Sequence, residues 1–173
     1  MRRIILVSII ALAFLLTFVP ISKAEMAKEG SGNYRVGKSG TFEVMSMGKD
    51  RLQMNYDEAG AFVEAPENSP FENASFRAIG SLHAVNKKFA GSGAILITCP
   101  NGDQIFGTFQ SEGVLGVGPT GGTVELIGGT GACTGIQGKM EMLPRPAVKT
   151  SKKGAYQGIG IGKITWKIPQ KKK

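Results

Sequence analysis

The chain has 173 residues, 25 of them glycine, and carries a formal net charge of +8. One histidine and two cysteines cannot supply a zinc site at the usual ligand spacing, so we predict neither a metal nor a cofactor. A positive charge attracts nucleic acid, but aromatic side chains that would stack on bases are not interleaved with the basic residues. We therefore expect no nucleic-acid partner.

The first 24 residues have the pattern of a secretory signal peptide. Two arginines precede an apolar run from Ile4 to Val19, and Ser22 and Ala24 supply the small residues of a cleavage site. At about 1.5 Å per residue, the apolar run reaches ~24 Å as a helix, short of a ~30 Å hydrocarbon core. We expect a secreted or periplasmic protein, cleaved after Ala24, that keeps no transmembrane segment.

The two ends of the remaining chain are polar. Residues 25–40 are rich in glycine and polar side chains, and are predicted to form a flexible N-terminal arm before a β-barrel domain over residues 41–168. Residues 169–173 form a basic C-terminal tail, and no acidic residue follows Glu141. Such a tail is typical of a solvated, frayed end, and a weak contact with an anionic surface is the alternative.

From residue 41 onwards, short segments alternate polar and apolar residues, as half-buried strands do. Asn86-Lys87 and Asn101-Gly102 mark hairpin turns. Helix caps and apolar residues at helical spacing are missing from these segments. About eight strands joined by turns predict an all-β fold, and the many glycines favour an eight-stranded antiparallel β-barrel. The predicted strands are 41–47, 51–57, 75–85, 88–99, 104–111, 123–128, 136–143 and 154–168.

Three glycine-rich stretches resemble phosphate-binding loops only in their letters. GNYRVGKS (32–39) fits the P-loop pattern, and GVGPTG (116–121) fits the dinucleotide pattern, but neither is followed by the helix that would face the phosphates. GGTGACTGIQGKM (128–140) fits neither pattern. We interpret this last stretch as a tight corner between two barrel strands.

The two cysteines, Cys99 and Cys133, are candidates for a disulfide in an oxidising compartment. Such a bridge would stabilise the fold by roughly 3–4 kcal/mol in the chain-entropy model. In a simple meander, however, their strands lie three positions apart, or ~14 Å, beyond the ~7 Å limit for bridged Cα atoms. A loop that folds over the barrel mouth would close the gap, so the sequence leaves both states open.

The last predicted strand carries three alternating glycines on one face. They either leave room for a ligand or allow a neighbouring strand to approach closely. An eight-stranded barrel is just wide enough to hold one small ligand. The candidate lining of an apolar ligand site is therefore Phe106, Tyr156, Gly158, Gly160, Gly162 and Trp166.

ELIGGTGACTGIQGKMEM (125–142) resembles the late-strand signature of the allene oxide cyclase-like barrel superfamily, a pattern of the type G-G-[TS]-G-x-x-x-G-x-x-G. SPFENASFRAIGSLHAV, GSGAILI and NGDQIFGTF resemble consecutive strands of its small secreted bacterial members. The resemblance covers residues 41–168. It implies an eight-stranded barrel with an apolar interior, similar in fold to dirigent proteins, that often assembles as a homo-oligomer.

Plant allene oxide cyclases convert a fatty-acid epoxide in that interior, and a glutamate in a Tyr-Glu-Ile-Asn stretch takes part. The nearest match is Phe42-Glu43-Val44-Met45, which keeps Glu43 but has Met45 in place of the asparagine. The resemblance makes Glu43 the candidate catalytic residue. The period of two instead turns Phe42 and Val44 inward and Glu43 towards solvent.

Three functions follow from these observations. The leading hypothesis is a secreted or periplasmic barrel that binds a small apolar ligand. The second is a cyclase or isomerase that acts on an apolar, fatty-acid-like substrate. The third is a structural or surface-interacting protein.

Overall fold

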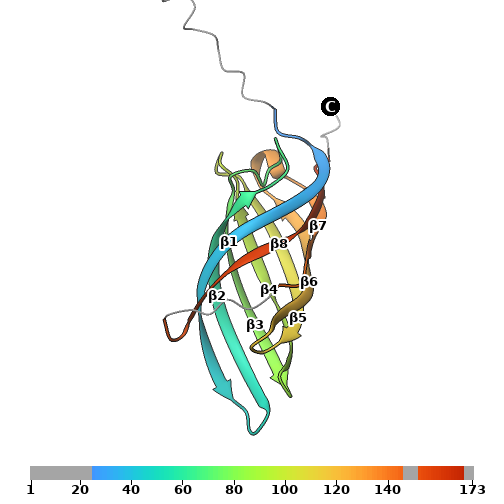
Figure 1. Cartoon of the computed structure of the whole chain (residues 1–173). Coiled ribbons are helices and arrows are strands. Elements are labelled where there is room, and N and C mark those ends of the chain that lie inside the picture. The colour runs from blue at the N-terminus through green and yellow to red at the C-terminus, as the bar shows by residue number, and fades with distance from the viewer. Residues whose placement is uncertain (1–24, 146–151, 170–173) are drawn as a thin grey trace, which may run out of the picture.

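The computed structural model describes residues 25–145 and 152–169. Eight antiparallel strands form a closed barrel in which each strand pairs with the next and β8 pairs with β1 (Figure 1). The predicted all-β fold and eight-stranded antiparallel barrel are confirmed. The elements are β1 (Glu29–Ser46), β2 (Arg51–Glu64), β3 (Ser75–Val85), β4 (Lys88–Thr98), β5 (Gln104–Val114), β6 (Gly118–Gly129), the 3-10 turn η1 (Gly131–Cys133), β7 (Gln137–Met142) and β8 (Ala155–Lys167).

Strand β1 begins well before the predicted start of the barrel. The prediction of a flexible arm over residues 25–40 is wrong from Glu29 onwards, because this segment pairs with β8 as far as Thr41. Tyr34 and Val36 are buried while Arg35 between them is exposed, so the period of two is present. The glycines around these residues, which contribute no apolar side chain, hide the pattern in the sequence.

Strand β2 also extends further than predicted, from 51–57 to Glu64. The inward face that carries Tyr56 continues through Glu58 and Phe62, and Glu58 is only 9% exposed. The added residues bring a buried carboxylate into the barrel wall. The turn of the β1–β2 hairpin, at the other end of β2, projects at the lower end of the view in Figure 1.

One end of the barrel is filled by side chains. This end carries η1 and both ends of the described chain (Figure 1). Phe71, from the β2–β3 connection, is 0% exposed, and its ring centroid lies 5.8 Å from that of Phe62 and 5.7 Å from that of Trp166. The indole N–H of Trp166 donates to the backbone oxygen of Ala27 at 3.1 Å. Other fully buried side chains of the same core cluster are Ile97, Ile105, Ile136 and Ile164.

The strand between β6 and β8 covers only part of the barrel wall, because β7 has only six residues. β7 pairs with β8 up to Gly162, so residues 155–161 of β8 have β1 as their only strand partner in the described chain. The chain crosses this part of the wall after β7. The Leu143 N–H donates to Ile161 O at 3.0 Å, and the Arg145 N–H donates to Pro119 O at 3.2 Å.

The three glycine-rich stretches lie in strands and turns of the barrel. Residues 32–39 lie inside β1, and residues 116–121 form the β5–β6 turn with the start of β6. Residues 128–140 run through η1 as a corner between β6 and β7, where Gly131 has a φ of +52°. Across residues 25–145 and 152–169, no helix is long and apolar enough to cross a membrane.

Candidate functional site

The barrel contains a cavity of about 490 Å³ between its filled end and the β5–β6 turn. This volume lies within the range of pockets that hold small molecules. The inward residues of all eight strands contribute to its wall, and most of them are apolar. Large apolar members are Phe42, Met54, Leu82, Phe89, Phe109 and Met142.

The three glycines of β8 play different parts. A Cβ atom on Gly158 would meet no atom of residues 25–145 and 152–169 within 4 Å, so this glycine opens onto free space among the described residues of the cavity wall. At Gly160 the guanidinium Nη1 of Arg145 lies 2.9 Å from the position of a Cβ. At Gly162, which does not line the cavity, the backbone oxygen of Glu141 and the ring of Tyr34 take the space. Only the first of the three glycines therefore provides room for a ligand.

Of the other three predicted lining residues, one lines the cavity and two do not. Tyr156 lines the cavity. Phe106 does not, and its prediction is wrong: Ile105 and Phe109 take the inward positions of β5, which leaves Phe106 on the outer face, 37% exposed. Trp166 is buried, but it belongs to the filled end rather than to the cavity.

Glu43 lies outside the cavity. Its side chain is exposed, while Phe42 beside it lines the interior. The period of two gives the correct direction here, and the role that the resemblance assigns to Glu43 is not available to it. Any chemistry in the interior needs another polar group.

That group is Glu58, which sequence reasoning missed. Its Oε2 accepts hydrogen bonds from the Tyr156 hydroxyl at 2.5 Å and from the Lys38 ammonium at 2.7 Å. The signal was present, because the inward series Met54, Tyr56 on β2 leads to Glu58 at the next step of two. The predicted strand ended one residue too early.

The two oxygens of Glu58 have different environments. Both hydrogen bonds reach Oε2, and none reaches Oε1 from the described residues. No buried side-chain oxygen in the described chain lacks a partner, so Oε1 retains accessible surface in the cavity. A carboxylate held at one oxygen and open at the other can accept a hydrogen bond, or a proton, from a molecule in the cavity.

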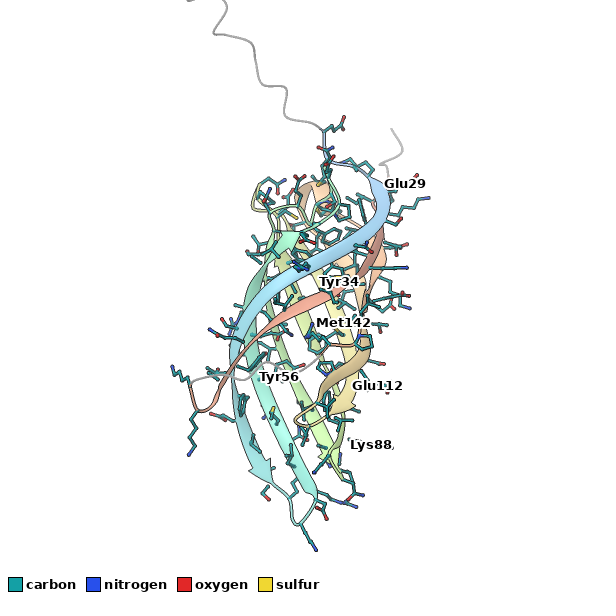
Figure 2. The ribbon with its side chains drawn as sticks, in the orientation of Figure 1. Glu29, Tyr34, Tyr56, Lys88, Glu112 and Met142 are labelled. Atoms are coloured by element: carbon teal, nitrogen blue, oxygen red, sulfur yellow. The ribbon has the colours of Figure 1, made fainter. Side chains whose placement is uncertain are left out.

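All three tyrosines of the chain line the cavity, and Figure 2 shows Tyr34 and Tyr56 at different heights along the barrel. Burial raises the pKa of Tyr34 to about 12, and the positive charge of Arg145 opposes the shift. Burial also raises the pKa of Tyr56 and of Tyr156, and the nearby charge of Glu58 adds to both shifts. The three phenols therefore stay protonated as hydrogen-bond donors.

The two cysteines meet at the filled end. The Sγ atoms of Cys99 and Cys133 lie 3.7 Å apart, both side chains are buried, and both are free thiols. The separation of ~14 Å that a simple meander would give does not apply, because η1 folds over the barrel end, which is the alternative that the sequence left open. Asp103 helps to hold η1 there, since its carboxylate accepts a hydrogen bond from the Ala132 N–H at 2.9 Å.

No group of three or more histidine, cysteine, aspartate or glutamate side chains in the described chain is arranged to hold a metal ion. The predicted signal peptide over residues 1–24, and residues 170–173 of the basic tail, lie outside the described residues.

Comparison of the sequence with family models and with curated proteins finds no match. Among solved structures, the chain is similar to a crystal structure of a protein of unknown function from the DUF3224 family of Shewanella oneidensis MR-1. The TM-score is 0.52 at 11% sequence identity, and the match covers 82% of this chain and 98% of that chain. At this identity the likeness concerns the fold alone, and it supports the barrel.

The tyrosine shifts predict a delayed phenol titration. An unfolded tyrosine ionises near pH 10. A pKa that is raised in the folded state therefore contributes stability that is fully present below pH ~10 and is lost as the pH rises through the folded pKa, which is about 12 for Tyr34. We expect the near-ultraviolet tyrosinate absorbance of the folded protein to appear well above pH 10, and the titration midpoint to shift to a pH of about 10 in denaturant. A tyrosine that ionises normally in the folded protein would contradict this arrangement.

The cysteine contact predicts that a disulfide forms on oxidation. Treatment with oxidised glutathione, which takes up the two electrons and two protons that the thiols release, should join Cys99 to Cys133. A thiol count in denaturant should fall to zero, and unfolding should require about 3–4 kcal/mol more than in the reduced protein. In Cys99→Ser the remaining thiol should stay titratable, and the oxidant should not raise the free energy of unfolding. Two titratable thiols after oxidation would disprove the bridge.

Proposed function

We propose that this protein is a barrel that binds one small apolar ligand in its interior. The observation that carries the proposal is the cavity of about 490 Å³ with its apolar wall. Water in such a cavity is poorly hydrogen-bonded, so its replacement by an apolar molecule is favourable. The filled end at Phe71 and Trp166 leaves the β5–β6 end as the side from which a ligand reaches this space.

Two further features support the proposal. The resemblance of residues 125–142 to the allene oxide cyclase-like superfamily implies an apolar barrel interior, and we propose membership of that superfamily. The open space next to Gly158 is the second feature, because other side chains or backbone atoms fill the space at Gly160 and Gly162 on the same face of β8. A single glycine that keeps part of the wall clear suits a cavity that has an occupant.

We also propose that the chain is exported and acts as a secreted or periplasmic protein. The n-region, apolar run and cleavage site over residues 1–24 support this. The contact between Cys99 and Cys133 is consistent with it, because an oxidising compartment is where such a pair becomes a bridge.

A second candidate function is an isomerase that moves a proton on an apolar substrate. The observation in its favour is Glu58, the buried carboxylate whose Oε1 has no hydrogen bond from the described chain. It replaces Glu43 as the polar group of this hypothesis. Tyr156 and Lys38 hold Oε2 and fix the orientation of the carboxylate.

The reaction would be a proton transfer without a redox change. Oε1 of Glu58 would take a proton from a carbon between a carbonyl group and a carbon–carbon double bond, and the electron pair would move to the carbonyl oxygen to form a dienolate. Return of the proton to the far carbon of the dienolate moves the double bond, restores the carboxylate and completes the isomerisation. A positive side chain such as Arg145, which lines the same cavity, would stabilise the dienolate.

Blocking the cavity tests the binding function. Gly158→Phe places a ring in open space without a clash with the described backbone, since a Cβ there meets none of its atoms within 4 Å. The affinity for a neutral fluorescent probe, N-phenylnaphthylamine, should fall about tenfold or more, equivalent to a loss of about 1.4 kcal/mol. Fluorescence titration measures the change, and thermal unfolding checks that the variant folds.

The matched control is Gly121→Phe. A Cβ on Gly121 would also meet no atom of the described part of the chain within 4 Å, but Gly121 does not line the cavity. This variant should bind the probe as the unmodified protein does. Equal affinity in both variants would overturn the proposal of an internal ligand site.

The second function is tested with nitrobenzisoxazole, a small apolar molecule that reports an accessible base. Removal of its C–H proton breaks the N–O bond and releases a coloured phenolate. Glu58→Gln should lower the rate by ~10²-fold or more, whereas Glu43→Gln, on the outer face, should not change it.

Because Glu58→Gln leaves the buried Lys38 without its partner, the double variant K38M/E58Q is measured as well. It removes both charges together and should also be inactive. An unmodified protein that does not accelerate the reaction, or a rate that survives both substitutions, would reject the isomerase hypothesis.

A further inference from the structure

The formal charges of the side chains that line the cavity do not sum to zero. Three of them line it: Lys38, Glu58 and Arg145. Lys38 and Glu58 form a pair 2.7 Å apart, and their side chains are only 16% and 11% exposed. Arg145 has no carboxylate partner among the described residues. The interior of the described chain therefore has one positive charge in excess.

The position of Arg145 is built by the wall of the barrel. Its backbone N–H donates to Pro119 O, which ties the segment after β7 to β6 and places the residue at the gap beside β8. Its guanidinium then lies over Gly160, with Nη1 2.9 Å from the position of a Cβ. A Cβ at position 160 would meet Val36 Cγ2 at 2.6 Å as well as this Nη1, so the glycine leaves room for both side chains.

The field of Arg145 reaches the other polar groups of the cavity. Burial lowers the pKa of Lys38, Glu58 opposes that shift, and Arg145 adds to it. For Tyr34 and Tyr156, where burial raises the pKa, Arg145 acts in the opposite direction. The guanidinium is thus close enough to influence three residues that line the cavity, on two different strands.

A half-buried guanidinium without a counter-ion is costly, and an anionic ligand offsets that cost. The fork of N–H donors on an arginine matches the oxygens of a carboxylate or sulfonate group, and the bond strengthens where water is excluded. The remaining wall is mostly apolar and aromatic. A molecule that fits both parts has an apolar body and one anionic group.

We propose that the cavity selects amphipathic monoanions, with Arg145 as the residue that binds the anionic group. This inference rests on the proposed binding function and names its ligand class. The pair of Lys38 and Glu58 is internally neutralised, so it leaves the selection to Arg145. The apolar body of the ligand then lies against the wall formed by side chains such as Phe109 and Leu82.

Two probes with the same ring system separate the charge from the apolar body: N-phenylnaphthylamine, which is neutral, and anilinonaphthalenesulfonate, which is anionic. The unmodified protein should bind the anionic probe about tenfold or more tightly than the neutral one. Arg145→Met should remove this preference and leave the affinity for the neutral probe within about twofold. Arg145→Lys, which keeps the charge but not the fork, should retain part of the preference.

Arg35→Met is the control for general attraction of anions to a basic protein. Arg35 lies on the outer face of β1, where it is exposed and pairs with Glu64 at 3.2 Å. Its replacement removes one positive charge from the surface and should leave the preference unchanged. An equal loss in Arg35→Met and Arg145→Met would show that the preference comes from net charge, and would overturn the assignment.

The outcomes also separate this inference from the function on which it rests. In one outcome, the neutral probe binds, Gly158→Phe blocks its binding, and the unmodified protein shows no preference for the anionic probe. This outcome rejects the role of Arg145 and keeps the apolar site. If neither probe responds to Gly158→Phe, the internal site itself is rejected. If Arg145→Met unfolds, the same comparison is made with Arg145→Gln, with thermal unfolding as the check.

Discussion

Pairing of β1 with β8 is the constraint on which the rest of this structure depends. It runs from Glu29↔Lys167 to Thr41↔Ala155 and closes the sheet into a barrel, although residues 155–161 of β8 have no second strand partner in the described chain. Once the sheet is closed, every second residue of each strand must point into a space of fixed width. A cavity arises only where those residues are too small, or lie too far apart, to meet.

The same constraint explains the contrast between the two ends. At the filled end, Phe71 enters from a loop and packs against Trp166, which adds aromatic volume beyond what the strands supply. In the other half, the strands provide glycines such as Gly158, and no loop of the described chain fills the space next to it. The polar residues Lys38 and Glu58 lie in this half and satisfy each other there.

Much of the fold could be predicted from the sequence, but less of the site. Strand β3 matches its predicted bounds because its apolar residues alternate cleanly, whereas the start of β1 is masked by glycine. Glu58 was predictable in principle, since continuing the alternation past residue 57 turns it inward. Arg145 was not, because it follows β7 in a segment without periodicity, and its direction depends on a contact with Pro119. The approach of Cys133 to Cys99 likewise depends on how η1 folds, which no strand pattern encodes.

The distribution of aromatic residues gives the protein two optical reporters at different depths. Its single tryptophan, Trp166, belongs to the filled end, while all three tyrosines line the cavity. Light at the red edge of aromatic absorption excites the indole alone, so tryptophan emission follows the packing around Phe71. Phenol absorption follows the cavity instead. Events in the cavity and loosening of the filled end can therefore be recorded separately in the unmodified chain, without an attached label.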